Sequence, residues 1–530
     1  QDVEPAVRAY DAAVVYELGR LADGFDRPSR PARIARHGLE FELVPGKTGR
    51  RVDREAASAA VVAALAESGE PAYGVSTGFG SLAQTRIPAD RRAELQRALI
   101  RSHAAGMGPP IEREAVRAMF LLRARSLAMG FSGARPELAE TIVAMLAEGL
   151  DPVVPEHGSL GASGDLAPLA HCALAMLGEG EVLDADERPV PAAAALERAG
   201  IEPPVLGPKE GLALINGTDG ILGMLILALA DLGPLLRLAD VAAAASTEAL
   251  LGTDRAFAED LIALRPQPGQ AASAANLRRL LGGSAIVASH RTDDPRVQDA
   301  YSIRCSPQVN GAARDTVAHA ERVAEAELAS AIDNPMVLPD GRVESCGNFH
   351  GAPVAMACDF LAIAAAEVGA ISERRTDRLL DPSRSQGLPA FLAPDAGVDS
   401  GLMIAQYTQA AMAAENRRLA APASVDSLPT SAMQEDHVSM GWGAARKLRV
   451  SVANLRRMLA VELTCACRGI ELRAPLAPAA GTGAALEALR GVVGGPGPDR
   501  WVSPELLAAE RLLGDGTLLA AVDDAVGGLE

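Results

Sequence analysis

The sequence predicts a mainly α-helical protein with a core bundle of long helices, a smaller N-terminal portion and few short strands. Three observations predict this fold class. Apolar residues recur at helical spacing over long stretches with few polar interruptions. Proline stands near the start and glycine just after the end of several stretches, as is common for helices. Aromatic residues make up only 3% of the 530 residues, so alanine, leucine and valine must fill the interior.

Three helices of moderate length are predicted in the N-terminal portion. The first covers Pro88–Ala104 and has its proline near the start. Glu112–Met129 ends before Gly130, and Pro136–Glu148 ends before Gly149. Because proline suits the first turn of a helix and glycine suits its end, these positions predict the helix bounds.

Longer helices are predicted further along, and helices of this length with few polar interruptions are expected to lie buried side by side. They are expected over Thr218–Leu251, Ala312–Ile332, Ala352–Leu379, Gly401–Ala420 and Glu435–Leu472. The most apolar run, Gly220–Ala230, is broken by Asp231 and is too short to cross a bilayer. It is interpreted as part of a buried core helix.

Strand signals are sparse, and Pro/Gly-rich connectors suggest the domain bounds. The best strand candidates are Glu40–Val44 and Met336–Val343, the second with a turn at Pro339–Gly341. The connector Gly200–Gly211 is expected to separate the N-terminal portion from the long helices. The expected segments are an N-terminal arm (1–34), an active-site portion (35–210), a central long-helix bundle (211–475) and a C-terminal helical segment (476–530). The arm is expected to make packing or oligomer contacts, with a disordered tail as the alternative.

Charge and cysteine usage exclude several classes of partner. The net charge of −18 disfavours nucleic acid and anionic membranes, which need a basic face. The six cysteines form no C-x-x-C pair, which favours free thiols in a cytoplasmic protein. The eight histidines show no H-x-x-x-H or H-E-x-x-H spacing, so no metal site is expected.

The tripeptide Ala162-Ser163-Gly164 is the most informative feature of the chain. Small side chains let the amide nitrogen of Gly164 reach the carbonyl carbon of Ala162, and loss of water closes a five-membered ring. Loss of the Ser163 hydroxyl then leaves an exocyclic methylidene, which is an electrophile. A capped turn is the alternative, with Asp165 near the helix N-cap and Pro168 in the first turn.

The segment Gly158–Leu169, followed by Ala170-His171, resembles the signature of the aromatic amino acid ammonia-lyase and aminomutase family. Members of that family build a 4-methylidene-imidazol-5-one (MIO) group from this tripeptide. Further segments resemble the family in the same order: Ala72–Gly80, Asn216–Thr218, Tyr301–Arg304, Asn348–His350 and Gln434–His437. The likeness runs from about Ala35 to about Leu472. It implies an MIO cofactor, a core of the fumarase/aspartase-like type, and a homotetramer whose active sites are shared between subunits.

The resemblance also implies roles for individual residues. Tyr73 would be the base that removes the β-proton, which requires a lowered pKa. Arg304 would bind the substrate carboxylate through its bidentate guanidinium. The remaining assignments are Tyr301 for orientation or proton handling, Asn216 near the substrate amine or the MIO carbonyl, and Gln308 and Phe349 at the pocket wall. The residues alone leave a core tyrosine, a surface arginine and a capping asparagine open for Tyr73, Arg304 and Asn216.

Ser102-His103 and Glu435 resemble the members of the family that act on histidine. A carboxylate at Glu435 can bind an imidazole N–H but matches a phenyl ring poorly. His103 could be a second imidazole contact, or a buried structural histidine at a helix end. The predicted function is therefore that of a carbon–nitrogen lyase, which eliminates ammonia from L-histidine to give trans-urocanate.

Alternatives and departures accompany this prediction. The nearest alternative is a tyrosine or phenylalanine ammonia-lyase or an aminomutase of the same family. A different class would be a lyase of the fumarase type or a helical oligomer without catalysis. Asp219 stands where many histidine-specific members carry glutamine, and Ser76 replaces a common asparagine. Both lie near the expected pocket, so they are expected to bear on affinity and pH optimum.

Overall fold

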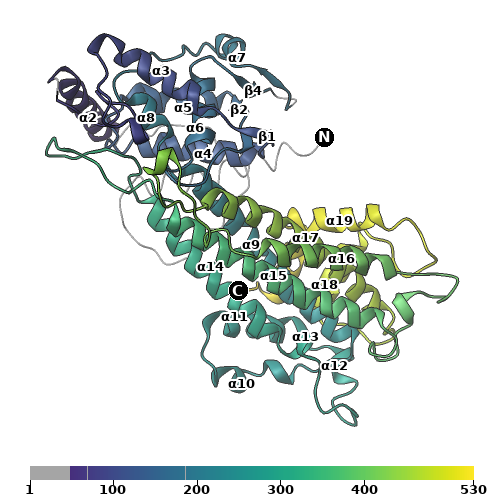
Figure 1. Cartoon of the computed structure of the whole chain (residues 1–530). Coiled ribbons are helices and arrows are strands. Elements are labelled where there is room, and N and C mark those ends of the chain that lie inside the picture. The colour runs from purple at the N-terminus through teal and green to yellow at the C-terminus, as the bar shows by residue number, and fades with distance from the viewer. Residues whose placement is uncertain (1–47, 69, 185–186) are drawn as a thin grey trace. The chain divides into compact units, whose positions relative to one another are not determined.

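The computed structural model describes residues 48–68, 70–184 and 187–530. The expected N-terminal arm and the strand candidate Glu40–Val44 lie outside these residues. The described chain is mainly helical with few short strands, which confirms the predicted fold class (Figure 1).

The chain divides into two compact units that interleave along the sequence. The first unit comprises the described residues up to Leu227 together with Arg322–Ala357 and Ala423–Arg446, and the second comprises Ala228–Glu321, Cys358–Pro422 and Lys447–Glu530. They do not coincide with the consecutive segments 35–210, 211–475 and 476–530. Four of the five boundaries fall inside the long helices α9 (Asp219–Ala249), α14 (Ser306–Leu328), α15 (Ala352–Leu380) and α17 (Gly441–Glu471), and the fifth, between Pro422 and Ala423, lies in the loop after α16 (Met403–Leu419). The connector Gly200–Gly211 lies wholly within the first unit.

The first unit is built from short helices and small antiparallel sheets. Its helices are α2 (Thr48–Ser68), α3 (Arg92–His103), α4 (Arg113–Leu127), α5 (Pro136–Ala147), α6 (Leu166–Met176), α7 (Ala192–Ala199) and α8 (Glu210–Ile215), with 3₁₀ turns η1 (Gly80–Leu82), η2 (Ala89–Arg91) and η5 (Ser431–Met433). Its strands are β1 (Met107–Pro110), β2 (Asp151–Pro152), β3 (Pro155–His157), β4 (Glu181–Leu183), β5 (Pro189–Pro191), β6 (Met336–Val337) and β7 (Val343–Glu344). Within the described residues the sheet orders are β1-β3, β2-β4-β5 and β6-β7.

Local signals predicted several of these elements well. Helices α3, α4 and α5 confirm the three predicted helices of moderate length. Gly130 and Gly149 adopt the left-handed backbone at φ +74° and +66°, which explains why the chain turns away after α4 and α5. The predicted turn before Val343 is present, since β6 and β7 pair antiparallel with Val337 opposite Val343.

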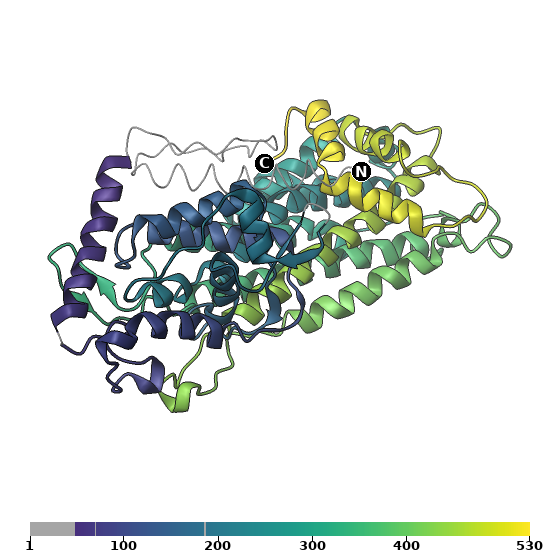
Figure 2. The same cartoon turned by 90° about the horizontal axis from the view of Figure 1, so that it is seen from above.

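In the second unit the long helices lie side by side (Figures 1 and 2). Its other elements are η3 (Arg255–Phe257), α10 (Glu259–Ala263), α11 (Pro268–Leu281), α12 (Ala285–Ala288), α13 (Tyr301–Arg304), η4 (Ala390–Leu392), α16 (Met403–Leu419), α18 (Ala480–Arg490), α19 (Ser503–Gly514) and α20 (Thr517–Val526). Gln409 of α16 donates to Ser372 Oγ at 3.1 Å and to the Met458 carbonyl at 2.9 Å. These bonds tie α16 to α15 and α17.

Two of the predicted long helices have shifted starts. Helix α14 begins at Ser306, before the predicted Ala312, and α17 begins at Gly441, well after the predicted Glu435. Met440 adopts φ +54°, which is incompatible with a continuous right-handed helix. Glu435 therefore lies in the loop before α17, and the prediction that it begins the helix was wrong.

The most apolar run, Gly220–Ala230, lies inside α9, whose bounds agree closely with the predicted helix Thr218–Leu251. By length and composition alone, Glu210–Ala249, which contains α8 and α9, and α15 could each cross a membrane. More than half of each apolar window, 61% and 56%, is buried within the chain, and buried core helices pass the same test. Helix α9 continues through Asp231 because Arg449 and Arg456 pair with its carboxylate at 3.1 and 3.2 Å. The whole helix is therefore long enough to span a bilayer although Gly220–Ala230 alone is not, and its burial agrees with the interpretation of this run as part of a core helix.

Candidate active site

The tripeptide Ala162-Ser163-Gly164 lies in the bend that precedes α6. Gly164 adopts φ +75°, and a Cβ built on it would overlap the carbonyl oxygen of Gly217. Only glycine tolerates both this backbone conformation and this approach. The backbone of the tripeptide is therefore packed directly against the backbone of Gly217.

Asp165 connects the tripeptide to the start of α9. Asp165 occupies the N-cap position of α6, as expected, but within the described residues its carboxylate makes no hydrogen bond to that helix. Oδ2 instead accepts the N–H groups of Gly220 and Ile221, both at 2.9 Å, and Ser159 donates to Oδ1. These are the unpaired donors of the first turn of α9. Burial nevertheless raises the pKa of Asp165 to about 7.

Glu435 lies against the tripeptide although it is far away in sequence. Its Oε1 accepts a hydrogen bond from Ser163 Oγ at 3.1 Å, and its Oε2 accepts one from Thr430 Oγ1 at 2.8 Å. The Glu435 carbonyl also accepts from the Thr430 backbone at 2.8 Å. The carboxylate is thus held by its own loop in contact with the Ser163 hydroxyl.

Tyr73 lies half-buried in the glycine-rich loop, with its ring edge-on to Phe79 at 6.2 Å between ring centres. Its hydroxyl accepts the N–H of Gly80 at 3.0 Å. Burial raises the pKa of Tyr73, and the nearby carboxylates of Glu435 and Asp333 raise it further. The hydrogen bond from Gly80 acts in the opposite direction and lowers it. In the described chain the pKa of Tyr73 thus moves opposite to the lowering that a base requires, first because the phenol is buried and second because carboxylates lie near it.

Ser76 shapes the loop that carries Tyr73. Its buried hydroxyl donates to the Glu70 carbonyl at 2.8 Å and accepts the Ala72 N–H at 2.9 Å. Ser81 N–H donates to Ser431 Oγ at 3.1 Å, so this loop is also joined to the loop of Glu435. The departure at Ser76 is thus a structural support one turn from the tyrosine.

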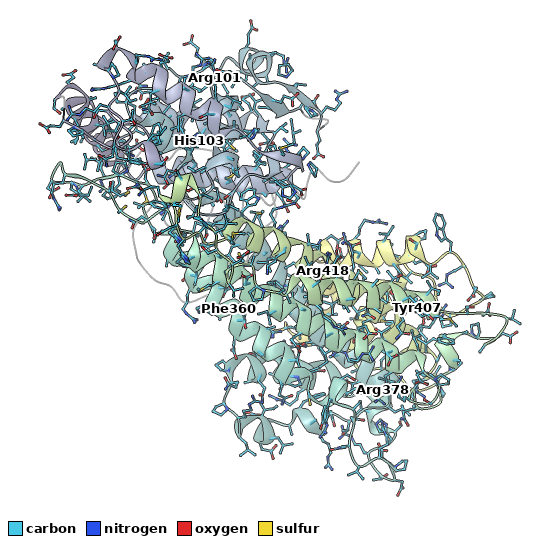
Figure 3. All side chains as sticks on the ribbon, in the orientation of Figure 1. Arg101, His103, Phe360, Arg378, Tyr407 and Arg418 are labelled. Carbon is cyan, nitrogen blue, oxygen red and sulfur yellow. The ribbon has the colours of Figure 1, made fainter. Side chains whose placement is uncertain are left out.

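His103 is the last residue of helix α3 (Figure 3). Its Nδ1 donates to the Leu99 carbonyl at 2.9 Å, and this carbonyl also accepts from Ser102 Oγ. Burial lowers the pKa of His103, while the charge of Glu435 acts in the opposite direction. The ring is therefore both the helix-end histidine and a neighbour of the Glu435 carboxylate.

Asn216 and Phe349 also belong to the first unit. Asn216 follows α8, and its Nδ2 donates to the Asn334 carbonyl at 3.1 Å. Its Oδ1 is buried and has no hydrogen-bond partner in the described part of the chain. An unpaired buried acceptor is costly, which is consistent with a bound donor at this position. Phe349 is half-buried, next to His350, whose ring stacks on His437 at 5.8 Å.

Tyr301, Arg304 and Gln308 lie in the second unit. Helix α13 brings the Arg304 guanidinium over the Tyr301 ring at 4.6 Å, and the tyrosine is 72% exposed. Arg304 Nε and Gln308 Oε1 are buried without hydrogen-bond partners among residues 48–68, 70–184 and 187–530. Both polar groups are thus available to a ligand.

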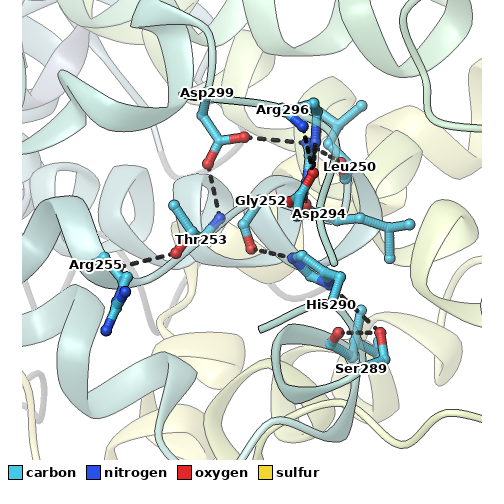
Figure 4. A network of polar contacts seen from close by, with 11 residues as sticks. Leu250, Gly252, Thr253, Arg255, Ser289, His290, Asp294, Arg296 and Asp299 are labelled. Atoms are coloured by element: carbon cyan, nitrogen blue, oxygen red, sulfur yellow. Dashed lines mark hydrogen bonds and ion pairs between the residues drawn. The ribbon is translucent and has the colours of Figure 1, made fainter. Parts of the chain in front are cut away.

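A polar network fixes the chain that leads into Tyr301 (Figure 4). Arg296 donates to Asp294 at 2.7 Å and to Asp299 at 3.1 Å, and also to the Leu251 carbonyl. Asp299 in turn accepts the Thr253 N–H at 2.7 Å. The segment before α13 is therefore tied to the end of α9.

Several buried charged pairs were not predicted from the sequence, among them two in the first unit. Arg123 on α4 is fully buried and lies 3.4 Å from Asp219. Lys209 and Asp333 are also fully buried, 2.7 Å apart. The available signal was a charged residue inside an apolar helical pattern, as in the run around Arg123, but its partner is remote in sequence.

Comparison with known proteins identifies the family. The family model described as aromatic amino acid lyase matches residues 32–491, which is most of the chain. The chain belongs to the aromatic amino acid lyase family.

Named relatives of this aromatic amino acid lyase cover nearly its whole length. The histidine ammonia-lyase of Streptomyces griseus is 60% identical over 499 residues, 94% of this chain and 96% of the relative. The crystal structure of histidine ammonia-lyase from Trypanosoma cruzi shares 41% identity over 90% of each chain, with a TM-score of 0.83. The tyrosine aminomutase from Streptomyces globisporus shares 35% identity over 98% of each chain, with a TM-score of 0.85.

Two further properties of this family member concern its thiols and possible metal ligands. All six cysteines lie in the described part of the chain and are free thiols. Among the described residues, no group of three or more His, Cys, Asp or Glu side chains is placed to hold a metal ion.

Proposed function

We propose that this chain is a histidine ammonia-lyase, which converts L-histidine to trans-urocanate and ammonia. The observation that carries the proposal is the position of Glu435, whose carboxylate touches Ser163 of the tripeptide and has His103 as a neighbour. A carboxylate at this position provides the acceptor that an imidazole N–H requires. The histidine ammonia-lyase relatives described above support the same substrate.

The proposal includes an MIO group made from Ala162, Ser163 and Gly164. The left-handed Gly164 and its close approach to Gly217 support it, because no larger residue fits that bend. When formed, the group supplies an electrophile that ordinary side chains lack. The contact between Ser163 and Glu435 places an acceptor beside the hydroxyl that must be lost.

The other residues of the chain bind the substrate and move its proton. Tyr73 takes the β-proton at its hydroxyl oxygen, where the Gly80 N–H stabilises the phenolate. Arg304 binds the α-carboxylate and Asn216 accepts from the substrate amine; each has a buried polar atom without a partner in the described chain. Tyr301 handles orientation or protons, and Gln308 and Phe349 line the pocket.

We also propose that the protein works as a cytoplasmic homotetramer whose active sites are shared between subunits. Apolar side chains on α15 and α16 of the second unit support the assembly, since they are exposed in the single chain: Phe360, Ile363, Ile404 and Tyr407. Figure 3 labels Phe360 and Tyr407. The free cysteines support a reducing compartment.

The test is the near-ultraviolet absorbance of urocanate after L-histidine is added to the purified protein, with L-tyrosine and L-phenylalanine in parallel. We expect a rise with histidine alone. Turnover of an aromatic amino acid instead would contradict the roles of Ser102, His103 and Glu435. A β-amino acid product would favour the aminomutase alternative, which is also consistent with the likeness to the tyrosine aminomutase. Turnover of none of the three would contradict the proposal.

A further inference from the structure

Behind the tripeptide, the Asn216-Gly217 peptide lies between Gly164 on one side and a buried ion pair on the other. A Cβ built on Gly217 would overlap both Arg123 Nη1 and Asp219 Oδ2. A Cβ built on Gly164 would overlap the Gly217 carbonyl oxygen. The three layers are therefore in van der Waals contact, with no side chain between them.

The ion pair holds the far side of this peptide. Arg123 is fully buried; its Nη1 donates to the Asn216 carbonyl at 2.9 Å and its Nη2 to the Ile332 carbonyl at 3.0 Å. Asp219, at the first position of α9, faces the same Nη1 at 3.4 Å. A planar guanidinium with several donors fixes the peptide in both position and orientation.

The near side of the peptide is joined to the tripeptide segment. The Gly217 carbonyl accepts the N–H of Asp165 at 2.7 Å. Asp165 also binds the N–H groups of Gly220 and Ile221, immediately beyond Asp219. The backbone at 216–221 is thus bonded to Arg123 on one side and to the residue after the tripeptide on the other.

We propose that Arg123 and Asp219 are positioning residues for ring closure in Ala162-Ser163-Gly164, an inference that rests on the proposed function. Closure forms a bond from Gly164 N to the Ala162 carbonyl carbon. The oxygen of that carbonyl leaves as water with the amide hydrogens of Ser163 and Gly164. Ser163 then loses its hydroxyl and its Cα hydrogen as a second water. No atom is oxidised or reduced.

The geometry explains why a backing is needed. Gly164 N must approach a carbonyl carbon two residues earlier, which ordinary backbone avoids. Gly164 cannot retreat, because the Gly217 carbonyl lies behind it, and Gly217 cannot retreat, because Arg123 and Asp219 lie behind that. The pair therefore confines the nitrogen to conformations close to attack, and small displacements of such groups slow reactions strongly.

The test is the intact mass of purified variants, measured soon after folding and again over time. The unaltered chain is expected to weigh two waters less than its encoded mass, and Ser163→Ala to show no such deficit. Arg123→Met is expected to keep its encoded mass, or to lose the waters about a hundredfold more slowly. Arg123→Lys, which restores one donor, is expected to lie between these limits.

Arg117→Met is the matched control. Arg117 lies on the same helix, is also buried, and donates to the buried Asp151 at 2.6 Å. We expect Arg117→Met to lower the melting temperature about as much as Arg123→Met does. Its intact mass should nevertheless show the full deficit of two waters.

The inference is overturned if folded Arg123→Met loses two waters as fast as the unaltered chain. If Arg123→Met does not fold, Asp219→Asn, which keeps size and removes charge, decides by the same criterion. An unaltered chain of full encoded mass would instead refute the proposed function.

Discussion

At the residue scale, Tyr73 has the clearest test among the site side chains. Its hydroxyl is bonded to Gly80 N–H, and its pKa is raised by burial and by Glu435. We predict that Tyr73→Phe lowers kcat by roughly a hundred- to ten-thousandfold, the range for loss of a general base. The intact mass should keep its deficit of two waters, because the proposed ring closure uses the backbone of the tripeptide and the Ser163 hydroxyl and not the phenol of Tyr73.

Tyr407→Phe is the matched control for this change, because it removes the same hydroxyl from a tyrosine that has no place in the proposed active site, and it keeps the apolar ring on α16. Unchanged kcat in Tyr73→Phe would contradict its role as the base.

Asp165 predicts a pH dependence of stability. Burial raises its pKa from 3.8 to about 7, so the folded chain keeps a proton there that the unfolded chain has already lost. The stability that this proton binding gives the folded chain is fully present below the ordinary pKa of 3.8. It is lost as the pH rises from there toward the folded-state pKa of about 7. The pKa shift corresponds to a decrease in the free energy of unfolding on the order of 4 kcal/mol across this pH range. Asp165→Asn, which cannot titrate, is expected to flatten the fall in stability between about pH 4 and about pH 7.

The measurement is denaturant unfolding of both chains across that range. The matched control is Asp340→Asn: Asp340 is exposed, and Arg342 lowers its pKa, so it should add no fall over the same window. An equally steep fall in Asp165→Asn would contradict the prediction.

Single residues were predicted unevenly from the sequence. The likeness to a family indicated Ser163, Tyr73 and Glu435 as site residues, and the first unit brings these three together. The bonds of Asp165 to α9 and the burial of Arg123 were not predicted. Their partners lie far away in sequence, and no local pattern shows that a carboxylate will cap a helix other than its own.

At the scale of elements, helix ends were predicted where local chemistry decides them. Helix α5 begins at Pro136 and ends before the left-handed Gly149, as both residue types favour. The start of α17 was not predicted, because Ser439 donates to the Gly161 carbonyl at 2.9 Å and the chain turns at Met440. A contact with the tripeptide loop overrides the helical spacing there.

The segment before α13 gives a prediction at this scale. Arg296 holds it through Asp294, Asp299 and the end of α9. We predict that Arg296→Ala costs about 1–3 kcal/mol of unfolding free energy, since charged hydrogen bonds are lost. The substitution should also raise KM for L-histidine about tenfold. Arg304 follows this segment, and a small displacement of its guanidinium would weaken binding of the substrate α-carboxylate.

Unfolding curves and initial rates measure the two effects. Arg291→Ala is the matched control. Arg291 lies in the same segment and pairs with Asp254, but its side chain is more exposed than that of Arg296. An unchanged KM in Arg296→Ala would contradict the positioning of Arg304 by this network.

At the scale of the whole molecule, the division into units could not be predicted from connectors. Each unit draws on separate stretches of sequence, and four of the five boundaries fall inside helices, with the loop at Pro422 as the exception. Helical periodicity indicates which face of a helix is apolar but not which part of it packs with which neighbour. The class of fold was therefore predictable, and its partition was not.

The proposed assembly gives the last prediction. Ile363 is an exposed apolar residue on α15, one turn from Phe360. If this face is buried between subunits, Ile363→Glu places an unpaired charge there and should split the tetramer into smaller, folded species. Size-exclusion chromatography with light scattering measures this. Leu264→Glu is the control, since Leu264 is an exposed apolar residue outside the long helices.

The proposed sharing of active sites between subunits can be tested separately from the assembly itself. Tyr73 lies in the first unit and Arg304 in the second, so a site completed by two subunits can draw each from a different chain. Co-expressed Tyr73→Phe and Arg304→Ala chains should then recover histidine turnover that neither has alone. Tyr73→Phe with Glu435→Gln should not recover it, because both residues belong to one site of one chain. Absence of recovery in the first mixture, with mixed tetramers demonstrated by mass, would contradict sharing of the site.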